Sequence, residues 1–221
     1  MIKFPNYWWM ADGPPQKPTK EEDGGTPPDM PVIFLGTDGD HSSDDSVEVA
    51  QNKLFFYADV SRSEILKLNK HLDSLEKKVL TNSILLNTDP SNIYLHINSF
   101  GGSLFAGLAG VDYIKKCKVP VHTIIDGCAA SAATLMSVVG AHRQMHRHSF
   151  MLIHQLSTVM WGKYEDLKDD MKNNDLLMKT IKDIYVEHTK IPKRQLNKIL
   201  KHDLWWDAET CLKYGLIDEI L

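Results

Sequence analysis

One serine in the chain stands where a nucleophile would be most reactive. Ser131 follows the letters GCAA at the end of a predicted strand, and it stands at the predicted start of a helix rich in small residues. The first backbone N–H groups of a helix lack partners within it, and the helix dipole favours negative charge at that end. A serine hydroxyl here could attack a carbonyl carbon, because the resulting oxyanion would be stabilised. A lone serine in this place is more often only a helix cap.

Two other segments could complete such chemistry. The letters NSFGGS follow a predicted strand, and the N–H of Gly101 within them could be a second donor to the oxyanion. Most Gly-Gly pairs after strands are, however, only turns. His154 ends the apolar run FMLIH and could act as a general base, although a single histidine in such a place is more often a hydrogen-bonded core residue. Each of these signals is weak when it is taken alone.

The elements that must hold these residues alternate between strands and helices from residue 46 onward. Apolar runs predict strands, and apolar positions three or four residues apart predict helices. The strands are predicted at residues 46–60, 92–97, 121–126 and 150–155, and the helices at 61–80, 104–117, 129–139 and 163–189. This alternation is typical of an α/β fold. The last helix would be about 40 Å long, so we expect it to project from the domain and to pack on something else.

The composition excludes several classes of protein. The chain has 221 residues, of which 43% are hydrophobic and 24% charged, as expected of one large globular domain or two small ones. No uncharged run is long and apolar enough to cross a bilayer, so we expect no membrane association. The three cysteines form no CxxC pair, which argues against a disulfide framework and a zinc site. Because the first residues also lack a signal-peptide pattern, we expect a cytoplasmic protein.

The first part of the chain differs from the rest. Residues 1–50 carry ten acidic and three basic side chains, and they hold seven of the ten prolines. Prolines interrupt helices and sheets alike, so residues 1–45 are predicted to form a flexible acidic arm and residues 46–221 a single domain. Neither part is basic enough to bind nucleic acid.

A histidine-rich stretch could suggest a metal. The letters AHRQMHRH bring together His142, His146 and His148. No cysteine or carboxylate lies near them in the sequence, so a solvated turn and an edge strand are favoured over a metal site. We expect neither a metal nor another cofactor.

Four motifs in a fixed order resemble one known family. They are YLHINSFGGSLFAGLAGVDYI, DGCAASAATLMSVVGA, FMLIHQ and HDLWWDAETCLKYGLIDEI, and together they span roughly residues 52–221. The chain resembles the proteolytic subunit of the Clp protease, a family of serine peptidases. The resemblance implies a ClpP/crotonase-like spiral of ββα units with a projecting long helix. It also implies a nucleophile, a general base, an orienting acid and two oxyanion donors, which fall in that order on Ser131, His154, Asp203 and the backbone N–H groups of Gly101 and Ala132.

The resemblance also bears on assembly. The order Ser, His, Asp differs from the orders in chymotrypsin, subtilisin and the α/β-hydrolases, and no GxSxG motif occurs. Members of the family stack heptameric rings in pairs through the long helix and the strand before it. The resemblance therefore implies a ring homo-oligomer that cleaves unfolded polypeptides, with an AAA+ unfoldase as a further candidate partner.

At several positions the chain departs from the family pattern. Phe100 replaces a proline, and Leu156, Thr158 and Val159 stand where the family has a proline and a Gly-Gly pair. Together with Gly102, these residues are predicted to border the groove in which a peptide pairs as an added strand. The cleavage preference of the family therefore does not transfer to this chain.

A further departure concerns the pairing of rings. His202 replaces an arginine that pairs, across the ring interface, with an acidic residue early in the long helix, here Asp166. A histidine carries a positive charge only when it is protonated, so the sequence predicts pairing that weakens toward alkaline pH. The alternative is that His202 merely packs or faces solvent.

The sequence thus predicts a serine endopeptidase that acts inside a ring as the proteolytic subunit of an ATP-dependent Clp-type protease. One alternative is a virus-type maturation protease that acts without an ATPase, because the acidic arm has no counterpart in the short axial loops of the family. Another alternative is a non-catalytic ring subunit. The presence of Ser131, His154 and Asp203 argues against it.

Overall fold

The computed structural model describes residues 47–221, and the arm predicted at residues 1–45 lies outside this part. The strands of the described part are β1 (Val47–Ala50), β2 (Lys53–Phe56), β3 (Ile93–Ser99), β4 (Val121–Ala130), β5 (His142–Met145), β6 (Phe150–Leu152), β7 (Trp205–Trp206) and β8 (Glu219–Ile220). Its helices are α1 (Arg62–Leu86), α2 (Leu104–Lys116), α3 (Ala132–Val138), α4 (Tyr164–His188), α5 (Lys193–Ile199) and α6 (Ala208–Tyr214). The predicted α/β fold is confirmed.

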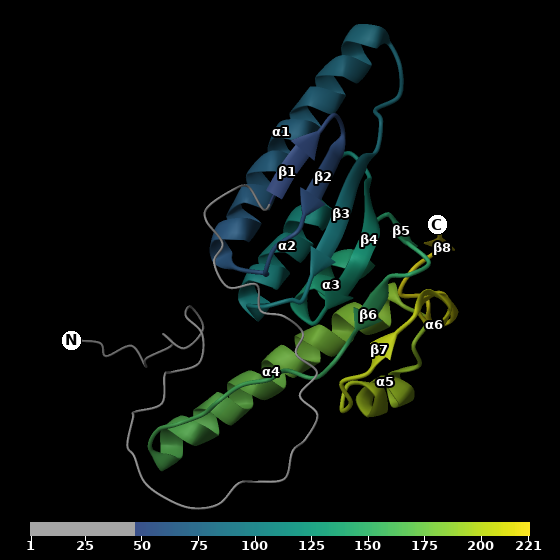
Figure 1. Ribbon diagram of the computed structural model, residues 1–221. Helices are drawn as coiled ribbons and strands as arrows, with labels where there is room; N and C mark the ends of the chain where they lie inside the picture. Colours follow the sequence, from purple (N-terminus) through teal and green to yellow (C-terminus); the bar gives the residue numbers. More distant parts are fainter. Residues whose placement is uncertain (1–46) are drawn as a thin grey trace, which may run out of the picture. The chain divides into compact units, whose positions relative to one another are not determined.

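All strands belong to one mixed sheet (Figure 1). Six of them lie in the order β1-β2-β3-β4-β5-β8, while β6 pairs with the end of β4 and β7 pairs with β6. The strands β2, β3, β4 and β5 run parallel, and α1 and α2 connect the first three of them. Parallel neighbours end at the same edge of a sheet, and Ser99 at the end of β3 accordingly lies opposite Ala129 near the end of β4. Loops that follow β3 and β4 are therefore brought together.

The alternation of residues along β3 shows which face of the strand packs on the core. Ile93, Leu95 and Ile97 are completely buried, while the residues between them are only partly buried. This period of two is expected of a strand with one face against the core. The cap predicted for α1 is also present, because the Ser61 hydroxyl accepts the N–H of Glu64 at 3.2 Å.

Two predicted elements have other boundaries in the structure. The region at 46–60, predicted as one strand, contains the hairpin of β1 and β2, which turns at Gln51 with a φ of 58°. The helix predicted at 129–139 begins only at Ala132, because β4 continues to Ala130 and pairs there with β6. Hydrogen bonds to a neighbouring strand outweigh the intrinsic helix preference of alanine at this point.

The prediction of an edge strand in the histidine-rich stretch is wrong. β5 lies between β4 and β8, because the last residues of the chain return to the sheet. The guanidinium of Arg143 fixes this return, since it donates to the Asp218 carboxylate and to the carbonyl oxygens of Gly215 and His188. Nothing in the local letters indicates a pairing with residues so far along the chain.

The short helix α3 is completely buried, and the neighbouring α2 explains its position. All seven residues of α3 are buried. A Cβ at Gly107 of α2 would lie 3.1 Å from the Cβ of Ala132, and one at Gly110 would lie 3.2 Å from the Sδ of Met136. The two glycines therefore allow α2 and α3 to approach more closely than larger residues would, which holds α3 firmly in the core.

The long helix α4 projects from the rest of the domain, as predicted (Figure 1). Only Ile181 and Tyr185, both in its second half, are buried. The hydroxyl of Tyr185 makes a hydrogen bond of 2.5 Å with the Thr134 hydroxyl, which connects this half of the helix to α3. The first half of α4 lacks such burial. Neither α4 nor any other helix within residues 47–221 combines the length and apolarity needed to cross a membrane.

Candidate active site

Ser131 occupies the single residue between β4 and α3, and its backbone is strained. Its φ is 54° and its ψ is −126°. A non-glycine residue in such a conformation costs about 1–3 kcal/mol, and such residues cluster at functional sites. Two backbone hydrogen bonds hold the residue. Its N–H donates to the Leu152 carbonyl at 2.9 Å, and its carbonyl accepts the N–H of Thr134 at 3.0 Å. The hydroxyl makes no capping bond to α3, so the simple role as a helix cap does not apply.

Gly101 lies directly against the serine. A Cβ on Gly101 would be 2.7 Å from the Cβ of Ser131 and 3.2 Å from the backbone nitrogen of Ala132, and its φ is +97°. Ala132 is the first residue of α3, so its N–H belongs to the donors that a helix leaves without an internal partner. The loop after β3 and the start of α3 therefore form one wall beside the Ser131 side chain.

The second donor to an oxyanion is better supplied by Gly102 than by Gly101. The N–H of Gly101 already donates to the Ser99 hydroxyl at 3.2 Å. Two hydrogen bonds of 2.7 Å hold the loop: the N–H of Val60 donates to the Gly101 carbonyl, and the N–H of Ser103 donates to the Val60 carbonyl. Neither bond uses the N–H of Gly102. That N–H has no partner among the described residues. The sequence predicted the donor at Gly101 and placed Gly102 in the groove; only the hydrogen-bond pattern indicates that the N–H of Gly102 is the one left available.

His154 and Asp203 lie next to two short strands, β6 and β7, that pair with each other. His154 follows β6, and the carbonyl of Leu152 in β6 accepts the N–H of Ser131. Asp203 precedes β7, whose Trp205 lies opposite Leu152. The His154 Nδ1 is 3.5 Å from an Asp203 carboxylate oxygen. Two paired strands of three and two residues thus bring His154 and Asp203 to each other, and the first of these strands holds the backbone of Ser131.

The three side chains do not form a continuous hydrogen-bonded chain in the described part of the protein. Within residues 47–221, no hydrogen bond joins the Ser131 hydroxyl to His154. The His154 side chain is 22% exposed, whereas that of Asp203 is 76% exposed. Hydrogen bonds of catalytic groups are often long in the absence of substrate and shorten when substrate binds.

The residues predicted to line the groove have different surroundings. Phe100 is 56% exposed, and its ring meets that of Trp205 edge to face at 6.3 Å between ring centres. Leu156 is partly buried against the core, and its N–H points to the sulfur of Met178 at 3.0 Å. Thr158 buries its hydroxyl without a hydrogen-bond partner in the described part of the chain. Among these three residues, only Phe100 has a largely exposed side chain.

The two residues predicted to pair rings contact different parts of the chain. The Asp166 carboxylate accepts the N–H of Lys163 at 3.2 Å and so caps the start of α4. His202 is exposed and lines a pocket of about 200 Å³. Within the described chain, no interaction joins Asp166 to His202.

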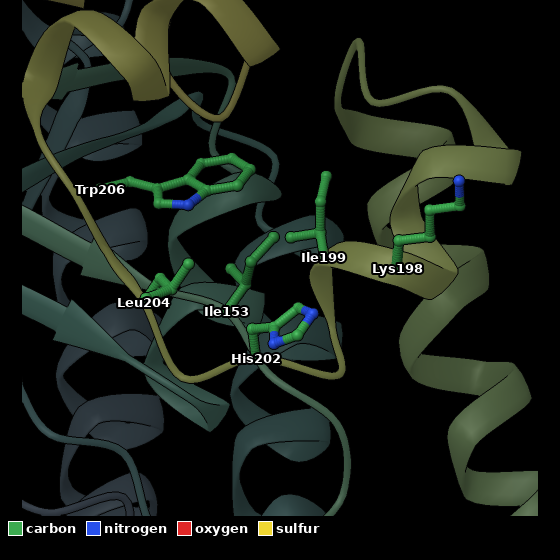
Figure 2. A pocket seen from close by; sticks show the side chains of 6 residues that line it. All are labelled: Ile153, Lys198, Ile199, His202, Leu204 and Trp206. Atoms are coloured by element: carbon green, nitrogen blue, oxygen red, sulfur yellow. The ribbon is translucent and has the colours of Figure 1, made fainter.

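This pocket is lined by neighbours in sequence of His154 and Asp203 (Figure 2). Its apolar walls come from the residue before His154, from α5 and from the residues around Asp203: Ile153, Lys198, Ile199, His202, Leu204 and Trp206. Figure 2 shows that α5 forms one side of the pocket and that the chain leading into β7 forms the other. The residues next to His154 and Asp203 therefore line the same pocket.

A second cluster of ionisable groups lies away from the serine. The Asp126 carboxylate accepts hydrogen bonds from the Tyr57 hydroxyl at 2.7 Å and from His96 at 2.8 Å, and it lies 3.2 Å from His146. Burial raises the pKa of Asp126, but these hydrogen bonds and the nearby histidines lower it more, so its pKa is below the ordinary value. Burial and the carboxylate raise the pKa of Tyr57 to about 12. No group of three or more metal-ligand side chains within residues 47–221 is arranged to hold a metal ion.

The groups around Ser131 are the parts of a serine-type hydrolase. A strained serine, free backbone N–H groups and a His–Asp pair come from four segments that the pairing of β3, β4, β6 and β7 brings together. Such a set can activate a hydroxyl, stabilise an oxyanion and protonate a leaving group.

Comparison with known proteins identifies the family. The Clp protease family model matches residues 50–221. Three similar proteins bear the name ATP-dependent Clp protease proteolytic subunit. One from Deinococcus radiodurans is 31% identical over 170 residues, which cover 75% of this chain and 83% of the relative. One from Streptococcus mutans is 34% identical over 67% of this chain and 79% of the relative, and one from Borrelia garinii is 34% identical over 75% and 88%. The chain belongs to the Clp protease family of serine-type endopeptidases, and the predicted resemblance is confirmed.

Proposed function

We propose that the chain is the proteolytic subunit of an ATP-dependent Clp-type protease and that Ser131 is its nucleophile. The proposal rests above all on the backbone of Ser131, whose strained conformation presents an uncapped hydroxyl beside Gly101 and the start of α3. The names of the relatives support the coupling to ATP. An AAA+ unfoldase that delivers unfolded polypeptides is accordingly the proposed partner, and a cytoplasmic location stays a prediction.

In the proposed mechanism, His154 acts first as a base and then as an acid. Its Nε2 takes the proton of the Ser131 hydroxyl while the serine oxygen attacks the carbonyl carbon of the scissile peptide bond. The negative oxygen that forms accepts hydrogen bonds from the N–H groups of Ala132 and Gly102. His154 then gives the proton to the leaving amine, and the C–N bond breaks to leave an acyl-enzyme. Water then attacks the ester carbon while His154 takes its proton; the C–O bond breaks, and His154 gives that proton to the serine oxygen, which releases the carboxylic acid product and free Ser131.

Asp203 is proposed to orient the imidazole. A proton on Nδ1, directed at the Asp203 carboxylate 3.5 Å away, leaves Nε2 free to act as the base. The carboxylate also stabilises the imidazolium that forms during each proton transfer. Because Asp203 is so exposed, we expect substrate or a neighbouring copy to tighten this contact during turnover.

Covalent labelling tests the role of Ser131. We expect a fluorophosphonate probe to label the assembled native protein and to leave Ser131→Ala unlabelled, because the probe needs an activated hydroxyl. His154→Ala should label far more slowly, since its serine lacks a base. Labelling that persists in Ser131→Ala, or its absence in an assembled native ring, would refute the proposed nucleophile.

Rings are the assembly known for this family, and we propose heptameric rings paired through α4. The first half of α4 and the loop before it expose apolar side chains, with Trp161 95% exposed and Val159, Tyr164 and Leu176 also open. Apolar surface of this kind marks an interaction site. A second ring that packs against α4 would bury it.

The proposed pair of His202 and Asp166 makes ring pairing depend on pH. One carboxylate oxygen of Asp166 already accepts the N–H of Lys163, which leaves the other for a partner. Protonated His202 from the opposite ring would fill this place at low pH and lose its charge as the pH rises. We expect sedimentation velocity to show fewer double rings at pH 8.5 than at pH 5.5, and His202→Arg to remove the difference. Equal fractions at the two pH values in the native protein would contradict the pairing.

A further inference from the structure

The pocket between α5 and the chain leading into β7 has an apolar interior that is open to the surface. Figure 2 shows four apolar side chains around one space, with His202 at its edge; they belong to Ile153, Ile199, Leu204 and Trp206. Leu204 is 62% exposed although it lines the pocket. An apolar cavity of about 150 Å³ can hold a benzene ring, so a pocket of about 200 Å³ has the size expected for a larger aromatic group.

Trp161 is an aromatic group of this kind that its own chain leaves uncovered. It lies in the loop before α4 and is 95% exposed, so it does not occupy the pocket of its own copy. Tryptophan is one of the residues that most often anchor a contact between proteins, because it buries a large rigid ring. The indole of Trp161 is therefore available to a second molecule.

The backbone holds Trp161 next to Asp166. A Cβ on Gly162, the residue after Trp161, would lie 3.3 Å from the Asp166 Cβ and 3.4 Å from one of its carboxylate oxygens. Trp161 and Asp166 thus share one surface, just as His202 shares the pocket with its apolar walls. An acidic group beside an indole on one copy therefore matches a histidine beside an apolar pocket on another. The proposed pair of Asp166 and His202 would bring Trp161 to the pocket.

We propose that the occupant of this pocket is Trp161 of a second copy of the chain, which enters it when two rings pair. This inference rests on the proposed function and names the contact that holds the paired rings. The contact is self-complementary, because each of two copies related by a twofold axis donates one indole and receives one. It also favours pairing with a second ring of this same chain over pairing with a ring that lacks the indole or the pocket.

Tryptophan fluorescence tests the burial of Trp161 in the native assembly. The chain has five tryptophans, so the signal of Trp161 is taken as the difference between the native protein and Trp161→Phe. We expect this difference signal to shift to shorter wavelength, and to become less accessible to acrylamide, when single rings pair at pH 5.5. The same signal in single and double rings would overturn the proposal, and so would a native protein that forms no double rings at any concentration.

A double-mutant cycle tests whether the indole enters this pocket. Sedimentation velocity measures the dissociation constant of ring pairing. We expect Trp161→Ala to raise this constant roughly 30-fold or more and Trp161→Phe to raise it less than about 5-fold. Leu204→Ala should raise it by roughly 5-fold alone, but by less than about 2-fold when Trp161 is already alanine, because the two side chains form one contact.

Ile84→Ala is the matched control for this cycle. Ile84 is an apolar residue that is 80% exposed, and Figure 1 shows its helix α1 ending on the side of the domain away from α4. Its substitution should leave ring pairing unchanged. Full additivity of Trp161→Ala and Leu204→Ala would place the indole outside the pocket, leave the pocket to a ligand other than this chain, and overturn the proposal. Failure of the proposed function is seen separately, as absent fluorophosphonate labelling of the native ring.

Discussion

Replacing His154 by alanine is expected to lower kcat for peptide hydrolysis by roughly 10⁴- to 10⁶-fold. A serine hydroxyl is a weak nucleophile until a base removes its proton, and the leaving amine needs a proton before the C–N bond can break. Both transfers depend on this one imidazole. Cleavage of a fluorogenic peptide by assembled protein measures the loss.

The pattern of losses is as informative as their size. The effects of substitutions on the rate do not add when the residues act as one unit. The double variant Ser131→Ala/His154→Ala should therefore be no slower than either single variant. Asp203→Asn should cost roughly 10- to 100-fold less than His154→Ala, because it affects only the orientation and charge of the imidazole. If His154→Ala kept a tenth of the native rate, His154 would not be the base.

Gly101→Ala is expected to inactivate the protein and also to destabilise it. The added Cβ would lie 2.7 Å from both the Ala130 carbonyl oxygen and the Ser131 Cβ, so the serine or the loop must move. The φ of +97° adds about 1–2 kcal/mol of strain for any residue with a Cβ. A displacement of the nucleophile by about 1 Å can cost about 100-fold in rate. We expect a lower denaturation midpoint and at least this loss in the rate of fluorophosphonate labelling.

Gly127→Ala separates the two causes of the expected loss. Gly127 also has a positive φ, of +80°, but its nearest contact would be the Asn98 amide at an ordinary 3.4 Å. The Gly127→Ala variant should therefore have a lower denaturation midpoint because of backbone strain, but the fluorophosphonate probe should label it at nearly the native rate. Equal loss of labelling in the two variants would mean that Gly101 acts through stability alone.

The sequence predicts those parts of the site that depend on local patterns. Ser131 at a strand–helix junction, the glycine pair before Ser103 and the histidine after an apolar run were all visible in the letters, although each was weak until their order matched a family. The spacing of apolar residues predicts the strand β3 and the helices α1, α2 and α4, because in each of them the apolar residues that pack on the core recur at a regular interval.

Parts of the site that depend on long-range pairing could not be predicted in this way. The shift of the start of α3 to Ala132 follows from a strand twenty residues further on, and the central position of β5 follows from the last residues of the chain. The free N–H of Gly102 results from bonds to Val60, which the letters around the glycine do not indicate. The contact of Phe100 with Trp205 likewise joins segments about a hundred residues apart.

The close approach of α2 to α3 limits how this sequence can diverge. Any side chain larger than hydrogen at Gly107 meets Ala132, which follows the nucleophile, and any at Gly110 meets Met136. Alanine at either glycine therefore requires a shift of a few tenths of an ångström, which the flexible Met136 side chain can make more easily than Ala132. Ala132 is already the smallest residue with a Cβ, so Gly107 has no compensating change available except a second glycine. Natural variants should accumulate at exposed positions outside the proposed ring interface long before they alter this helix pair.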